Sequence, residues 1–262
     1  MAHFGAIKAL EEAGIKPDLI TGTSIGAMVG AAYASGKIKE MEKFALSVNK
    51  RKTFSFMDTT FLKNGLVDGE KIAQYFSEHF FVKNVEDALI PLMLVATELE
   101  SGREIQISSG TLIDAVRASI SIPGIFTTVK MGDMHLVDGG LVNPLPINIA
   151  RDVGCNVVIA VDLNNEIHNP VKAKEANSDF KNRLVDWFKK EEPNLFEVIA
   201  NSIKIMEKKI TEANLKEYPA DILIQPELGH VKLFDFHKTE SSIKEGYEKT
   251  KEVIPEIKKL MQ

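Results

Sequence analysis

The 262-residue sequence has a single cysteine, Cys155, and no long apolar run. One cysteine excludes a disulfide framework or a cysteine-based zinc site within one chain. Its place beside the apolar residues 157–161 indicates a buried structural thiol. The longest apolar runs, such as residues 90–96, are too short to span a bilayer. The first residues lack the basic and then apolar order of a signal peptide. These absences predict a cytoplasmic protein.

Positive charge is not in excess either, because the formal net charge is −5. This balance argues against a general binder of the nucleic-acid backbone, and we expect no nucleic-acid partner. Apolar residues make up 44% of the chain and charged residues 26%. Such a composition is typical of a globular protein that buries a sizeable core.

Short apolar stretches alternate with amphipathic ones along the chain. The patterns predict helices at 6–13, 25–33, 112–118 and 147–153, strands at 19–21, 90–97, 104–108, 157–162 and 222–225, and a hairpin pairing 126–130 with 135–137 across Gly132 and Asp133. This alternation favours an α/β fold of three layers, with a mostly parallel sheet and helices on both faces. We expect a single domain over residues 1–262.

The segment from about 164 to 218 has no strand-like run and is predicted to form a helical insertion. Its apolar residues form two stripes at helical spacing. The first stripe is Phe180, Leu184, Trp187 and Phe188, and the second is Leu195, Ile199, Ile203, Met206 and Ile210. Two helices packed on the sheet are the simpler interpretation. A lid or a membrane-docking surface is the alternative, because Trp and Phe beside lysines also suit a lipid interface.

A serine lies between two glycines in the GTSIG stretch at residues 22–26, where a predicted strand ends and a predicted helix begins. A sharp strand-to-helix turn exposes and orients such a serine, Ser24, as a nucleophile. Side chains two residues to either side would collide there, which accounts for Gly22 and Gly26. The following helix N-terminus favours an oxyanion, with the N–H of Ile25 as a donor. A merely tight turn is the alternative.

The base that would activate this serine is less evident. None of the six histidines has a neighbourhood typical of a catalytic base; they are His3, His79, His135, His168, His230 and His237. Asp138 is a sharper candidate, because it ends a predicted strand and is followed by Gly139 and Gly140. Open α/β sheets build their sites in loops at strand carboxyl ends. Asp-Gly is also a common simple turn, and the sequence around Asp138 alone favours that interpretation.

Four stretches together resemble the patatin-like phospholipases over nearly the whole chain. They are Ala2 to Leu10 (AHFGAIKAL), Gly22 to Gly26 (GTSIG), Ala118 to Phe126 (ASISIPGIF) and Leu136 to Pro146 (LVDGGLVNPLP). The resemblance implies a Ser–Asp dyad without histidine, with Ser24 as nucleophile and Asp138 as base. It further implies hydrolysis of lipid acyl esters, or of a smaller ester, through an acyl-serine intermediate, without metal or cofactor. Peripheral contact with a membrane is compatible with such a substrate.

One part of the family pattern is not in this sequence. Members begin with a strand and a glycine-rich loop that supplies oxyanion donors, directly before the residues matching Ala2 and His3. The strand normally lies inside the sheet, and a domain without it would have two unpaired buried edges and an apolar gap, which few domains could survive. We also expect Met1 to be an internal methionine or a truncation point. Without that loop, a catalytically inactive lipid- or membrane-binding protein is the alternative to a hydrolase, and acyl transfer to another acceptor is a third interpretation.

Overall fold

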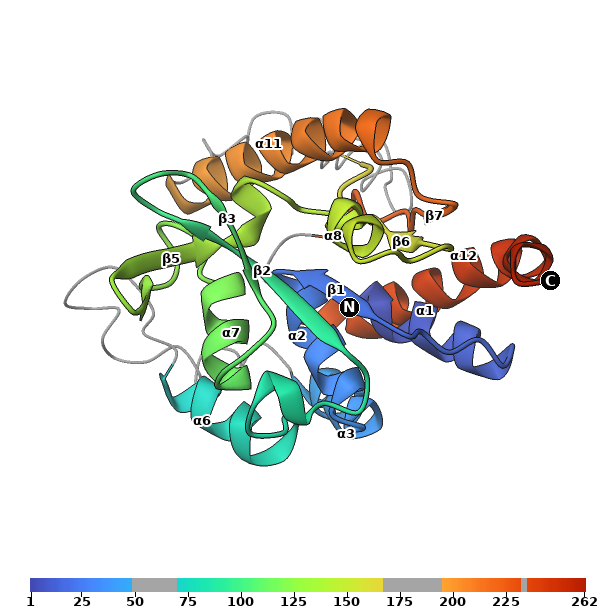
Figure 1. Cartoon of the computed structure of the whole chain (residues 1–262), viewed down its shortest axis with the longest axis horizontal. Helices are drawn as coiled ribbons and strands as arrows, with labels where there is room; N and C mark the ends of the chain where they lie inside the picture. Colours follow the sequence, from blue (N-terminus) through green and yellow to red (C-terminus); the bar gives the residue numbers. More distant parts are fainter. Residues whose placement is uncertain (49–69, 167–194, 232–234) are drawn as a thin grey trace, which may run out of the picture.

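The computed structural model describes residues 1–48, 70–166, 195–231 and 235–262. Its larger sheet contains β1 (Ile20–Thr23), β2 (Leu92–Glu98), β3 (Glu104–Ile107), β4 (Val129–Met131) and β5 (Met134–Asp138); a smaller sheet contains β6 (Ile159–Val161) and β7 (Ile222–Ile224). The α-helices are α1 (Ala2–Glu12), α2 (Ile25–Ala34), α3 (Ile38–Ser47), α6 (Glu70–His79), α7 (Leu112–Ser119), α8 (Ile147–Asp152), α11 (Leu195–Glu217) and α12 (Thr239–Leu260). Single turns of 3-10 helix are η1 (Val85–Asp87), η2 (Gly139–Leu141) and η3 (Phe236–Lys238). Figure 1 shows their arrangement.

The predicted α/β fold is confirmed, and the strand pairing within it is more mixed than expected. β1 with β2 and β6 with β7 are parallel, whereas β2 with β3, β2 with β5, and β4 with β5 are antiparallel. The hairpin between β4 and β5 turns at Gly132 and Asp133, as predicted. The antiparallel pairs β2–β3 and β4–β5 arise because each first strand continues into the second through a short turn. A prediction of parallel pairing from alternation with helices overlooks these local hairpins.

The smaller sheet has helices on both of its faces. Successive side chains of a strand point to opposite faces. On β6, Ile159 and Val161 pack with α12 residues such as Ile257, whereas Ala160 packs on the other face with α8 residues such as Ala150. Burial on both faces accounts for the continuous apolar run of this strand.

Among the described residues, a cavity lies between the two sheets. In the described part of the chain β1 pairs only with β2, and β6 only with β7. A cavity of about 2240 Å³ reaches both edges, and its lining includes Ile20 and Thr21 from β1 and Ile159 and Val161 from β6. The side chain of Ile7 on α1 also lines it. The two edges therefore face a common cavity and do not continue one hydrogen-bonded sheet.

Within the described residues, each helix and strand predicted from the sequence has a counterpart at nearly the same residues. Helices α3, α6 and α12 were not predicted. For α12 the reason lies in its composition, because a glycine and a proline, Gly246 and Pro255, lie inside the helix and both disfavour a helix interior. Packing against α1 outweighs this local preference.

The predicted insertion is described only in part. The stripe formed by residues 180–188 lies outside the described residues. The second stripe lies on α11, where Ile199, Ile203 and Ile210 are partly buried, but Leu195 and Met206 are exposed. Within the described residues no helix is both long and apolar enough to cross a membrane.

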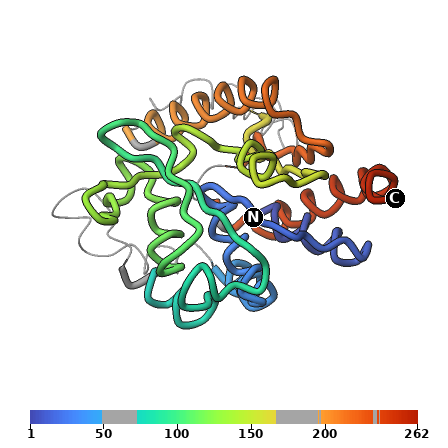
Figure 2. Tube along the Cα trace, viewed as in Figure 1, coloured from blue at the N-terminus to red at the C-terminus, as the bar shows by residue number. Residues whose placement is uncertain are grey.

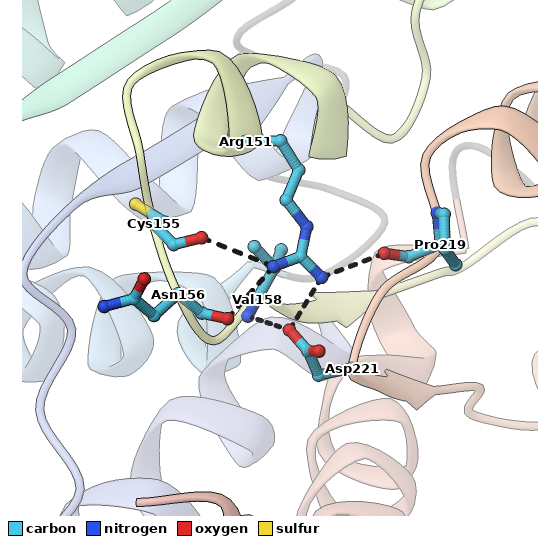
Figure 3. A network of polar contacts seen from close by, with 6 residues as sticks. All are labelled: Arg151, Cys155, Asn156, Val158, Pro219 and Asp221. Carbon is cyan, nitrogen blue, oxygen red and sulfur yellow. Dashed lines mark hydrogen bonds and ion pairs between the residues drawn. The ribbon is translucent and has the colours of Figure 1, made fainter.

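Arg151, at the end of α8, joins three neighbouring segments (Figure 3). Its guanidinium donates to the carbonyl oxygens of Cys155, Asn156 and Pro219 and forms an ion pair of 2.7 Å with Asp221. The same Asp221 oxygen accepts the N–H of Val158 at 2.7 Å. One planar side chain thereby fixes the loops that enter β6 and β7.

Helices α1 and α12 approach closely, as the blue and red ends of the chain show in Figure 2. A Cβ atom added at Gly5 would lie 1.9 Å from the carbonyl oxygen of Ile243, and one added at Gly246 would lie 2.1 Å from that of Ala2. Both distances are far inside van der Waals contact with backbone that has little freedom to move. The two glycines therefore permit this helix pair.

We predict that Gly246→Ala destabilises the protein by about 1–3 kcal/mol, because the added methyl group overpacks the α1–α12 contact. The direction is diagnostic, since Gly→Ala inside a helix ordinarily stabilises by up to about 1 kcal/mol. Urea unfolding measures the effect, with Glu248→Ala on the exposed side of α12 as control. A Gly246→Ala protein as stable as the wild type would contradict the close packing.

Candidate active site

Two strands meet end to end along one edge of β2. Residues 94–97 of β2 pair with β3 on one edge, so β1 and β5 share the other. β1 runs parallel to β2 and its Thr23 is opposite Val95, whereas β5 runs antiparallel and its Asp138 is opposite Ala96. The carboxyl ends of both strands therefore meet at adjacent β2 residues. This register brings the residues after β1 and at the end of β5 together.

Ser24 occupies the turn between β1 and α2 in a strained conformation. Its φ of 53° and ψ of −124° make it the one non-glycine residue with positive φ among those described. Its N–H donates to Oγ of the fully buried Ser119 at 2.9 Å. The preceding Thr23 hydroxyl donates to the carbonyl oxygen of Asn143 at 2.7 Å. Strain at a non-glycine residue persists only where its surroundings fix it, and these bonds do so.

The Ser24 hydroxyl donates a hydrogen bond of 2.7 Å to Oδ2 of Asp138. The other carboxylate oxygen, Oδ1, accepts the N–H of Gly140 at 2.8 Å. The backbone of Asp138 is held as well, because its N–H donates to the carbonyl oxygen of Ser121 at 3.0 Å and its carbonyl oxygen accepts from the Thr97 hydroxyl at 2.8 Å. Asp138 is only 3% exposed. Its carboxylate is therefore fixed toward Ser24.

Burial raises the pKa of Asp138 from 3.8 to about 6, and the hydrogen bonds from Ser24 and Gly140 lower it in part. Removing a carboxylate from water disfavours its charged form, whereas donors to that form favour it. At neutral pH the group is still mostly ionised. The site thus holds a carboxylate that is more basic than an ordinary aspartate and has a hydroxyl proton within reach.

Three glycines of the two motifs, Gly22, Gly26 and Gly139, differ in what they permit. A Cβ at Gly22 would lie 2.9 Å from backbone atoms of α2, and one at Gly139 would lie 2.3 Å from the carbonyl oxygen of Val95. Gly26 is different, because a Cβ there would make an ordinary contact of 3.7 Å with His3 Nε2. The clash expected from the sequence is therefore correct at Gly22 and wrong at Gly26. The sharp turn brings Gly22 against the backbone of the first turn of α2, whereas the side-chain position of Gly26 faces His3.

The site opens into the cavity between the sheets, whose lining includes Ser24, Ile25 and Gly140. Ile25 is the first residue of α2 and follows Ser24 directly. Backbone N–H groups at a helix N-terminus point outward along the axis and favour negative charge. A carbonyl oxygen bound beside Ser24 would therefore lie near a favourable potential.

The described histidines do not hydrogen-bond to either Ser24 or Asp138. His135 forms an exposed pair with Glu100 at 2.8 Å. His3 lies near Gly26, its buried Nδ1 has no hydrogen-bond partner among the described residues, and burial lowers its pKa to about 3. His168 lies outside the described residues. Nor do three or more His, Cys, Asp or Glu side chains gather as a metal site anywhere in the described ranges.

Three residues near the pair were not identified from the sequence. Ser119 accepts the Ser24 N–H, Glu207 on α11 lies against Gly140, and Asn164 after β6 donates to Glu207. A signal for Glu207 existed, because it lies between Ile203 and Ile210 at the spacing of the predicted apolar stripe. An acidic residue on an apolar helix stripe is unusual and indicates a polar partner.

The chain is similar to known proteins in the part that contains both motifs. Residues 1–151 match the family model described as patatin-like phospholipase. An NTE family protein of Mycobacterium tuberculosis is 34% identical over 186 residues, which are 70% of this chain and 52% of that protein. Lysophospholipase NTE1 of Kluyveromyces lactis is 30% identical over 266 residues, covering 94% of this chain and 18% of that one. The chain thus spans about half or less of these relatives.

Patatin-like phospholipase domain-containing protein 6 of Homo sapiens is 33% identical over 175 residues, which are 63% of this chain and 12% of that protein. Among solved structures, VipD from Legionella pneumophila has the same fold with a TM-score of 0.52 at 15% identity, covering 97% of this chain and 64% of that chain. The family match covers more than half of the chain. The chain therefore belongs to the patatin-like phospholipase family.

Proposed function

We propose that the protein hydrolyses acyl esters of lipids, with Ser24 as nucleophile and Asp138 as base. The observation that carries the proposal is the 2.7 Å hydrogen bond from the Ser24 hydroxyl to the buried Asp138 carboxylate. A serine hydroxyl is a weak nucleophile until a base takes its proton. In this site the carboxylate is the group in contact with that proton, and membership of the patatin-like phospholipase family supports a lipid hydrolase.

In the first half of the reaction Ser24 Oγ forms a bond to the ester carbonyl carbon while its proton passes to Asp138 Oδ2. The carbonyl oxygen becomes negative, and the N–H of Ile25 and the α2 N-terminus stabilise it. The tetrahedral intermediate then breaks its bond to the alcohol oxygen, which takes the proton from Asp138. An acyl group remains on Ser24, and Asp138 is again a carboxylate.

In the second half water attacks the acyl-serine carbonyl and gives a proton to Asp138. Collapse of this intermediate breaks the bond between the acyl carbon and Ser24 Oγ, which recovers the proton. The fatty acid leaves and the starting state returns. If another alcohol or a thiol replaced water, the same intermediate would give acyl transfer, so competition between acceptors separates the two reactions.

A lipid acyl chain suits the cavity beside the pair. The lining includes Ile25, Met28, Ile122 and Phe126, and burial of an alkyl chain against such residues gains about 0.8 kcal/mol for each methylene group. Among the relatives, one is named a lysophospholipase. We therefore propose a lysophospholipid or another single-chain acyl ester as the substrate class.

We predict that a fluorophosphonate probe labels the wild-type protein and not Ser24→Ala. Asp138→Asn should keep the fold and label at least about a hundredfold more slowly, because positioned general bases contribute about 10²–10⁴ in rate. Ser109→Ala, at an exposed position after β3, should label like the wild type. Circular dichroism verifies that each variant is folded.

If Ser24→Ala were still labelled, Ser24 would not be the nucleophile. If Asp138→Asn were labelled at the wild-type rate, Asp138 would not be the base. The non-catalytic lipid-binding alternative would be supported by a different result. In that case the folded wild-type protein and Ser24→Ala bind lipid vesicles equally, and neither protein is labelled by the probe or hydrolyses esters.

We further predict that kcat/KM for a soluble acyl ester falls about tenfold per pH unit below pH 6. The reason is that Asp138 must be ionised to accept a proton, and its pKa is raised to about 6. Activity is therefore present above this pKa and lost as the pH falls through it. If kcat/KM instead fell only near pH 4, the raised pKa of Asp138 would be contradicted.

A further inference from the structure

Helix α11 runs along the top of the molecule in Figure 1 and packs against η2, the turn that follows Asp138. A Cβ added at Gly124, in the loop after α7, would lie 3.3 Å from Cδ1 of Ile199. One added at Gly140 would lie 2.3 Å from Oε1 of Glu207. Both glycines thus allow α11 to approach the site. Its side chains also form part of the cavity wall, Ala200 and Ile203 among them.

The Glu207 side chain reaches from α11 to the Asp138–Gly140 turn. The point where a Gly140 Cβ would lie is 2.3 Å from Glu207 Oε1 and 3.1 Å from Asp138 Oδ1. The two carboxyl groups are therefore close neighbours across Gly140. The other oxygen, Glu207 Oε2, accepts a hydrogen bond of 3.0 Å from Asn164 Nδ2. Asn164 follows β6, so this carboxyl joins three separate parts of the fold.

Burial and the negative charge of Asp138 raise the pKa of Glu207 to about 8, and the Asn164 hydrogen bond and Lys204 lower it in part. The carboxyl is thus mostly neutral at pH 7. A neutral carboxyl beside Asp138 adds no charge to the pair, whereas an ionised one would place two carboxylates side by side. The contact between α11 and the turn is compatible with the protonated state and disfavoured in the ionised one.

We propose that Glu207 is a positioning residue of the site, which in its protonated form holds α11 against the Asp138–Gly140 turn. This inference rests on the proposed function for its catalytic consequence only. The helix forms a wall of the acyl cavity, so a loosened α11 weakens substrate binding more than it slows chemistry. Loss of the proton therefore raises KM and leaves kcat less affected.

The charged groups around Glu207 determine the sign of the effect. Asp138 approaches from the end of β5 and opposes ionisation, and Lys204, one turn earlier on α11, favours it. Lys204 is itself partly buried, which lowers its pKa, while Glu207 and Glu166 raise it. Because the docked pKa lies above the ordinary 4.5, docking is fully favoured below pH 4.5 and weakens as the pH rises to about 8.

The experiment compares the pH dependence of α11 docking in Ser24→Ala and in Ser24→Ala with Glu207→Gln. Neither protein turns over, so hydrogen exchange of the α11 amides reports docking independently of catalysis. After correction for intrinsic exchange, opening should increase by up to about tenfold per pH unit between pH 5 and 8 in the first protein. It should be independent of pH in the second, because the glutamine amide is neutral and its oxygen accepts the Asn164 bond.

In the active protein KM should rise as the pH increases toward about 8, and Glu207→Gln should remove this rise. The fall of kcat/KM below pH 6, which depends on Asp138, should be unchanged in Glu207→Gln. Glu207→Ala should raise KM at every pH, since the contact itself is lost. Glu212→Gln is the matched control, an exposed glutamate on the same helix paired with Lys209, and should behave like the wild type.

Opening of α11 that depends on pH equally in both Ser24→Ala proteins would overturn the inference. So would a KM that rises through pH 8 in Glu207→Gln as in the wild type. The two proposals can also fail separately. If the wild-type protein hydrolyses no ester, but opening of α11 depends on pH only when Glu207 is present, the proposed hydrolase is refuted and the positioning role of Glu207 stands.

Discussion

The site depends on one constraint, which is the end-to-end meeting of β1 and β5 on the same edge of β2. Thr23 pairs opposite Val95 and Asp138 opposite Ala96, so one strand presents the serine and the other the carboxylate at adjacent positions. A shift of one residue in either register would turn its side chains to the opposite face. Gly139 protects this register, because its lack of a side chain lets the turn after β5 lie against the β2 backbone.

This arrangement costs stability that the rest of the fold offsets. Burial that raises the pKa of Asp138 from 3.8 to about 6 corresponds to about 3 kcal/mol at neutral pH. That cost is absent below pH 3.8 and grows until the pH passes 6, so the carboxylate is retained against the stability of the protein. The strained φ of Ser24 adds a cost of about 1–3 kcal/mol. Close contacts such as those at Gly5 and Gly246 contribute on the favourable side.

Much of the fold was predictable because its signals are local. Apolar runs and amphipathic spacing located the strands and most helices, and the turn at Gly132 and Asp133 was specified by its own residues. The antiparallel pairing of β2 with β5 was not predictable, because it joins strands that are far apart in the sequence. Ser24 and Asp138 were identified as candidates by their motifs. For Glu207 the local pattern indicated only an acidic residue on an apolar helix stripe, whereas its approach to Gly140 depends on tertiary packing.

The smaller sheet shows how the site is supported where strand pairing ends. In the described chain β6 is joined to the larger sheet by no hydrogen-bonded strand, so its position depends on side chains. Arg151 ties the end of α8 to the loops before β6 and β7, and α8 itself follows closely on the Asp138 turn. Because Asn164 follows β6 and donates to Glu207, the same support extends to α11. Polar side chains thus help to position the wall of the cavity, and among them the Glu207 carboxyl has a pKa raised to about 8, so it binds a proton in a range where a backbone ladder does not.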